Sequence, residues 1–164
     1  MTSKVLSEDV KKEIDMVRLK FPKDQNKSSI IESLLLIQHA NGGYLSEALI
    51  EALADHLKIK KIDIYEVATF YSMFNLKPVG RNIISVCTNV SCMLRKSDEI
   101  VEYIEKKLKV KIGESTKDNK FYLKDEMECL AACNGAPMMQ VNHVNYENLT
   151  FTKIDEIIDG IKDD

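Results

Sequence analysis

Four cysteines in the second half of the chain constrain this sequence more than any other feature. They form two close pairs: four residues separate Cys87 from Cys92, three separate Cys129 from Cys133, and thirty-six lie between the pairs. Two thiolates at such spacing on a turn can reach one metal centre. Two such pairs supply four soft sulfur ligands, which suit zinc or an iron–sulfur cluster. We therefore expect a fold that brings two distant loops together.

Composition and the N-terminus indicate how these thiols are used. The chain has 164 residues, of which 45% are hydrophobic and 30% charged, as is typical of a globular protein. Its first nine residues contain no apolar core and carry acidic side chains early, unlike a signal or transit peptide. We therefore expect an intracellular protein, in which thiols stay reduced and the four cysteines form no disulfides.

The spacing within each pair separates the remaining alternatives. Dithiol redox sites and zinc knuckles typically have two residues between their cysteines, and neither pair has that spacing. The residues around both pairs are mostly small, which lets backbone N–H groups approach cluster sulfurs, and neither pair contains a lysine or arginine. An iron–sulfur cluster is our first interpretation of the four cysteines, and a structural zinc ion remains the alternative.

The charge balance excludes other classes of function. Lys and Arg number 23 against 26 Asp and Glu, so the net charge is −3, and the pI is about 5.7. Nucleic-acid binding by bulk electrostatics needs a basic excess, so we expect no nucleic-acid partner. The longest unbroken apolar run, residues 34–37, is far shorter than the roughly 18 residues that span a bilayer. We therefore expect no direct membrane insertion.

The first half of the chain has the periodicity of α-helices. Apolar residues recur at helical spacing in four segments, each of which follows or begins with a residue that can cap a helix. We expect these helices to begin near Ser7, Ser29, Ser46 and Asp63, with capping boxes at Ser29 and Asp63. The last helix should bury apolar side chains as far as Phe74, Tyr71 included. Short helices cannot bury a face alone, so they should form a bundle.

A break at residues 75–80, which contains Pro78 and Gly80, marks the expected domain boundary. We assign residues 1–78 to a helical N-terminal domain and residues 79–164 to a second domain. In the second domain we expect strands at 83–86, 110–112, 138–141 and 144–147, helices at 97–108 and 152–161, and a polar loop at 113–120. The predicted fold class is α+β: a helical bundle followed by an α/β layer with helices on a sheet.

Three stretches of the chain resemble, in order, the motifs of one family. They are Asp63 to Phe74, Cys87-Thr88-Asn89-Val90-Ser91-Cys92, and Cys129-Leu130-Ala131-Ala132-Cys133-Asn134-Gly135-Ala136-Pro137. The first resembles the signature helix, and the other two resemble the cluster motifs, of the E subunits of NADH-quinone oxidoreductase (respiratory complex I), which are thioredoxin-like 2Fe-2S ferredoxins. The resemblance runs from about Phe21 to Ile161, nearly the whole chain.

The resemblance implies a fold, a cofactor and a partner. It implies a thioredoxin-like second domain with one 2Fe-2S cluster held by Cys87, Cys92, Cys129 and Cys133, and no catalytic residue. It also implies an electron-transfer subunit that exchanges single electrons with FMN on a partner subunit that binds NADH. This chain has no G-x-G-x-x-G motif for a nucleotide of its own, so the isolated chain should be inactive. Such a subunit would be cytoplasmic, on the inner face of the membrane, and attached there through other subunits.

One residue departs from the family pattern. The family usually has glycine where Ala131 stands, and alanine costs on the order of 1 kcal/mol if that position needs a positive φ. The ligands all remain, so the departure concerns the shape of the loop. A second detail is Pro137, which precedes a strand where thioredoxin-like domains often hold a cis proline.

Three alternatives remain open at the level of sequence. The equivalent subunit of an NAD-linked hydrogenase or formate dehydrogenase would share every feature described above. A zinc-stabilised interaction module and a thiol–disulfide enzyme are the alternatives from other classes of function.

Overall fold

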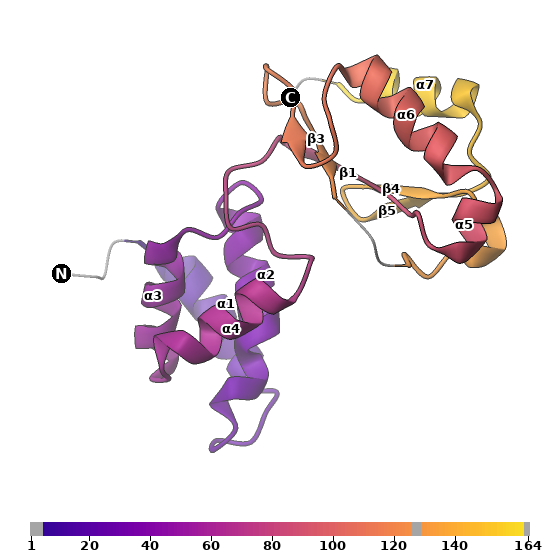
Figure 1. The fold of residues 1–164 in the computed structure, drawn as a ribbon. Coiled ribbons are helices and arrows are strands. Elements are labelled where there is room, and N and C mark those ends of the chain that lie inside the picture. Colours follow the sequence, from indigo (N-terminus) through magenta and orange to yellow (C-terminus); the bar gives the residue numbers. More distant parts are fainter. Residues whose placement is uncertain (1–4, 126–128, 163–164) are drawn as a thin grey trace. The chain divides into compact units, whose positions relative to one another are not determined.

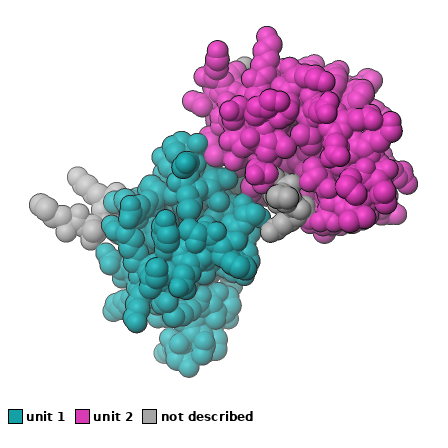
Figure 2. Space-filling model, in the orientation of Figure 1, with its two compact units in different colours: residues 1–78 teal, residues 79–164 magenta. Residues whose placement is uncertain are grey.

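Residues 1–78 and 79–164 form two units of different architecture in the computed structural model, which describes residues 5–125 and 129–162 (Figures 1 and 2). The first unit is helical and the second combines helices with a sheet, as the predicted fold class requires. Among the helices of the described residues, none combines the length and the hydrophobicity needed to cross a bilayer.

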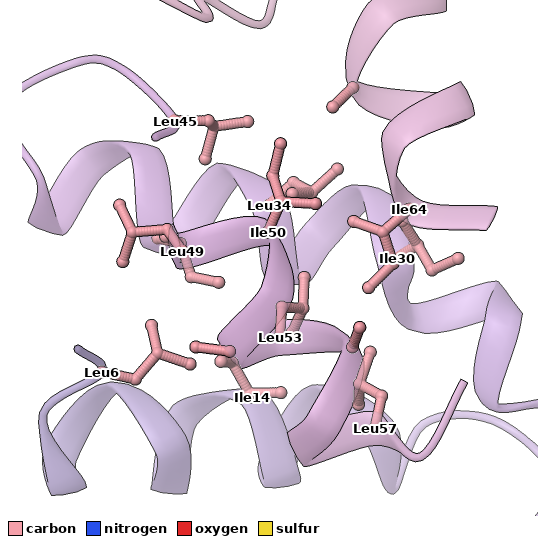
Figure 3. Close-up of a cluster of buried hydrophobic side chains, with 14 of the residues drawn as sticks. Leu6, Ile14, Ile30, Leu34, Leu45, Leu49, Ile50, Leu53, Leu57 and Ile64 are labelled. Atoms are coloured by element: carbon pink, nitrogen blue, oxygen red, sulfur yellow. The ribbon is translucent and has the colours of Figure 1, made fainter. Parts of the chain in front are cut away.

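The helices of the first unit bury one shared core. They are α1 (Glu8–Arg18), α2 (Ile30–Ala40), α3 (Glu47–Leu57) and α4 (Lys61–Phe70), with a 3-10 turn, η1 (Asn26–Ser29), before α2. Each contributes a fully buried side chain to the cluster in Figure 3: Ile14, Leu34, Leu53 and Ile64. Burial of such a side chain contributes about 1.5–3 kcal/mol, so this core is what holds four short helices together.

Two of the predicted helix caps are confirmed. The side chains of Ser7 and Ser46 accept hydrogen bonds from the backbone N–H groups of Val10 and Leu49, at 3.3 Å each. These bonds satisfy donors that have no partner inside the first turn of a helix.

The capping box predicted at Ser29 is wrong. Ser29 ends η1 and already has helical backbone angles, so its hydroxyl donates to the carbonyl of Asn26 instead of accepting from the next turn. The helix predicted to begin near Asp63 is confirmed as α4, which begins two residues earlier at Lys61, but the capping box predicted at Asp63 is wrong, because α4 has no side-chain cap.

The end of α4 also differs from the prediction. The helix stops at Phe70, and Tyr71, which we expected to be buried, is 39% exposed because the chain leaves the helix there. Phe74 is buried as expected, but it lies beyond the helix. Gln38 holds this segment against α2: its amide donates to the Met73 carbonyl and accepts from the Asn75 N–H.

The second unit is a five-stranded sheet in the order β2-β3-β1-β4-β5. The strands are β1 (Asn82–Val86), β2 (Glu114–Ser115), β3 (Phe121–Lys124), β4 (Met139–Val141) and β5 (Val144–Tyr146). β1 and β3 are parallel, and the other pairs are antiparallel. Two helices, α6 (Ser97–Leu108) and α7 (Phe151–Gly160), lie along one face of the sheet (Figure 1). Their buried isoleucines pack on the strands in a second core.

Most of the predicted elements of this unit are confirmed to within a residue or two, but the strand at 110–112 is not. Lys109, which follows the last residue of α6, has a left-handed backbone and turns the chain; Val110 is then a single buried residue, and the edge strand is β2. We did not predict β3, whose four residues lie between polar segments. Its pairing with β1, about forty positions earlier, makes it a strand.

Candidate metal centre

Strand β1 leads directly to the first cysteine of the first pair. Cys87 follows Val86, the last residue of β1, and its backbone N–H donates to the Met138 carbonyl at 3.2 Å. This bond extends the antiparallel pairing of Val86 with Met139 by one position. The sheet therefore holds Cys87 in place, and only 2% of its surface is exposed.

A short helix, α5 (Val90–Leu94), positions the second cysteine. The side chain of Asn89 accepts a hydrogen bond from the Val90 N–H at 2.8 Å and caps the helix. Cys92 is the one buried residue of α5, at 1% exposure. It packs with Cys87, Ala136 and Met138 in a small cluster separate from both large cores.

The second pair lies on an exposed loop. Cys129 and Cys133 are both exposed, and their Sγ atoms are 3.2 Å apart. Cys133 begins a 3-10 turn, η2 (Cys133–Gly135), and the Ala136–Pro137 peptide that follows is cis. The loop therefore places two thiols side by side at the surface, while the sheet and α5 hold two in the interior.

Cysteines of both pairs affect the pKa of the Cys92 thiol. Burial raises the pKa of this thiol to about 11; the neighbouring thiols of Cys87 and Cys133 act in the same direction, and a hydrogen bond with the Met138 backbone acts in the opposite one. Cys92 is thus affected by a sulfur from its own pair and by one from the other pair. The fold brings the four predicted ligand residues into one region, although two are buried and two are exposed.

The chemistry of the four side chains fits a 2Fe-2S cluster, whose two iron atoms each take two thiolate ligands. Four thiolates also suit a structural zinc ion. In the part of the chain that the structure describes, no three cysteine, histidine or carboxylate side chains form a ready-made group for a metal ion.

Backbone geometry at Ala131 answers the question raised by the sequence. Ala131 has φ +60°, so the position that is usually glycine in the family does adopt the left-handed conformation here. A side chain in this conformation costs about 1 kcal/mol relative to glycine. The alanine therefore strains the loop between Cys129 and Cys133.

Two contacts near the site were not predicted from the sequence. One is the backbone hydrogen bond of Met138 with the Cys92 sulfur. The other is the Glu147 side chain, which lies against Gly135, two residues after Cys133. Gly135 and its small neighbours were a weak signal of close approach, but nothing in the sequence indicated which segment approaches them.

Comparison with known proteins places most of the chain in one family. The model of the family described as Thioredoxin-like [2Fe-2S] ferredoxin matches residues 14–162. The E subunit of NADH-quinone oxidoreductase from Rickettsia bellii (strain RML369-C) is 48% identical over 145 residues, which are 88% of this chain and 86% of that protein. The same-named protein of Rickettsia conorii (strain ATCC VR-613 / Malish 7) is 49% identical, with the same coverage.

More distant similarities extend beyond bacterial proteins. Mitochondrial NADH dehydrogenase [ubiquinone] flavoprotein 2 of Dictyostelium discoideum is 42% identical over 149 residues, which are 91% of this chain and 60% of that protein. Among solved structures, the air-oxidized NAD+-reducing [NiFe]-hydrogenase matches with a TM-score of 0.64 at 19% identity, over 77% of this chain. The match spans only 22% of that hydrogenase chain, and identity this low shows a shared fold alone.

Proposed function

This chain belongs to the thioredoxin-like [2Fe-2S] ferredoxin family, and from that premise we propose that it is the 2Fe-2S electron-transfer subunit of an NADH-quinone oxidoreductase. Relatives that carry the name of that enzyme's E subunit share nearly half of its residues over most of both chains. The single observation that carries the proposal is that the fold brings two thiol pairs, far apart in sequence, into one region.

In this proposal, Cys87 and Cys92 hold one iron and Cys129 and Cys133 hold the other. The cluster supplies reversible one-electron chemistry at this position. The protein supplies a dry half, through the buried pair and Met138, and an open half at the surface loop. The hydrogen bond of the Met138 backbone with Cys92 stabilises the thiolate charge. Neither cysteine pair contains a lysine or arginine, so the backbone has to provide this stabilisation.

The electron donor is a flavin on a partner subunit. NADH gives up two electrons together as hydride, whereas this type of cluster accepts one, so a flavin must stand between them. The sequence has no G-x-G-x-x-G motif of its own. We therefore assign both FMN and the NADH site to the partner, and we expect this chain alone to be inactive towards NADH.

The partner contacts the second unit at the face around the exposed pair. Electron transfer slows steeply with distance, so a donor must approach the open half of the site. Next to that half, α5 carries three apolar side chains that are largely exposed: the exposed fractions of Val90, Met93 and Leu94 are 61%, 49% and 76%. Apolar side chains in such a position are typical of the centre of a protein–protein interface.

The organisation of the chain follows from this assignment. Residues 79–164 form the cluster domain and residues 1–78 a separate helical domain. Membrane attachment is through other subunits, which hold the chain on the inner, cytoplasmic face.

Metal analysis of protein purified without oxygen tests the proposal. We expect about two irons and about two acid-labile sulfides per chain; one zinc and no sulfide would contradict it. Cys129→Ser should lose most of the visible absorption, because a harder oxygen ligand suits this iron poorly. A full absorption band in that variant would contradict the ligand assignment. Subunits that co-purify with the chain distinguish a quinone reductase from a hydrogenase or formate dehydrogenase.

A further inference from the structure

The Glu147 side chain lies directly over the turn that follows Cys133. A Cβ atom placed on Gly135 would overlap Glu147 Oε2 and would be 2.5 Å from Glu147 Cβ and Cδ. The whole length of the side chain, carboxylate included, therefore runs against the backbone of the η2 turn. Only glycine leaves room for it at this position.

Hydrogen bonds fix the segment that carries Glu147. The Asn148 N–H donates to the Gly135 carbonyl at 2.6 Å, and the Leu149 N–H donates to the Pro137 carbonyl at 3.0 Å. The Lys153 ammonium donates to the backbone carbonyl of Glu147 at 2.5 Å. Leu149 is also buried in the second core. The chain around Glu147 is thus attached on both sides, and its carboxylate stays near the ligand loop although it is exposed to solvent.

The charge of this carboxylate is weakly compensated. Within the described ranges, no lysine, arginine or histidine nitrogen lies within ion-pair distance of it. Lys153 is the near cation, and its ammonium bonds to the Glu147 backbone rather than to the carboxylate. Neither cysteine pair contains a basic residue. A fixed negative charge therefore stands beside a site that holds a negatively charged cluster.

We propose that Glu147 is a positioning residue whose carboxylate lowers the reduction potential of the cluster through the Cys133–Gly135 turn. The inference rests on the proposed function, since it needs a cluster at this site. Reduction adds an electron to a group that is already negative, and a nearby fixed negative charge disfavours the reduced form more than the oxidised form. Water screens an exposed carboxylate, so the effect should decrease as ionic strength rises.

A redox titration of the full chain, followed by EPR, tests the proposal. Glu147→Gln keeps the shape of the side chain and removes its charge. Glu156→Gln is the matched control, because it removes the same charge from an exposed residue of α7. We expect Glu147→Gln to keep its iron content and EPR line shape and to titrate at a higher potential, with the control at the wild-type potential. Glu147→Lys should shift the potential further in the same direction.

Three results would overturn the proposal. Glu147→Gln could titrate at the wild-type potential, Glu156→Gln could shift as much, or Glu147→Gln could lose iron, which would indicate a purely structural role. These outcomes are distinct from failure of the proposed function, in which the wild-type chain itself would contain no iron or sulfide.

Discussion

The sulfur atoms of Cys129 and Cys133 lie 3.2 Å apart across a loop whose central residue, Ala131, has a left-handed backbone. The loop turns back on itself at Ala131, and this turn brings the two thiols together. The fold therefore sets the spacing of the exposed pair through a strained residue, whereas the buried pair is set by the sheet and by α5.

Relief of this strain gives the first prediction. Ala131→Gly should stabilise the cluster loop by about 1 kcal/mol, because glycine adopts a positive φ without a steric penalty. The measurement is the rate at which visible absorption is lost in the presence of a chelator, which should fall about fivefold. Ala132→Gly is the control: Ala132 has φ −120°, which any residue adopts, so glycine there should not slow the loss. Equal protection by both substitutions would contradict the account.

The buried thiol predicts a pH dependence for the metal-free chain. The pKa of Cys92 is raised to about 11 in the folded state, whereas an unfolded cysteine has a pKa of about 8.5. Between these two pH values the folded chain keeps the proton of the Cys92 thiol, whereas the unfolded chain releases it. This contribution to stability is fully present below about pH 8.5 and is lost as the pH rises to about 11. Urea unfolding of reduced, chelator-treated protein should show a fall in stability over that window.

The matched variant for this experiment is Cys92→Ser, which has no thiol to titrate at this position. It should show a smaller fall in stability over the same pH window. The same pH slope in both proteins would mean that Cys92 does not cause it.

The contact between Gly135 and Glu147 predicts a compensating pair of substitutions. Gly135→Ala should lower iron content, because its new Cβ overlaps the Glu147 side chain and overpacking of this kind costs about 1–3 kcal/mol. Glu147→Gly removes all the obstructing atoms, Cβ included, so the double variant should hold more iron than Gly135→Ala alone. Iron per chain and visible absorbance are the measurements. A double variant that loads no better than the single one would show that the contact is not the cause.

The exposed apolar face of α5 predicts a partner-specific defect. Leu94→Asp should weaken binding to the proposed flavin-carrying subunit by about tenfold, since an apolar interface tolerates a buried charge poorly. Cluster content should not change, because Leu94 is 76% exposed. Val144→Asp, at an exposed position on β5, is the control and should bind normally. Equal binding by both variants would place the interface elsewhere.

Local sequence patterns were sufficient to predict the elements that depend on their own periodicity. The buried stripe of α3, which follows its Ser46 cap, and the boundaries of α6, which follow from apolar spacing, are examples that one segment decides by itself. The strand β3 could not be found in this way. Four residues between polar loops carry little signal of their own, and they become a strand through pairing with β1 and β2.

Some features of the candidate site could likewise be predicted from local sequence, and others depend on the tertiary fold. The four cysteines could be identified from type and spacing alone, and a resemblance to known motifs named their cofactor. The sequence could not predict that the first pair, Cys87 and Cys92, is buried and the second pair is exposed. This difference depends on where β1 and the second loop meet. The Glu147–Gly135 contact joins residues twelve positions apart through the β4–β5 hairpin, and no local pattern encodes it.

Low-temperature EPR of the dithionite-reduced chain, purified without oxygen, tests the central claim most directly. Two thiol pairs that hold a diiron cluster predict one paramagnetic signal of about one spin per chain, which disappears when the protein is reoxidised. Cys87→Ser and Cys133→Ser, one from each pair, should both lose it. A colourless protein with no EPR signal after reduction would contradict the account.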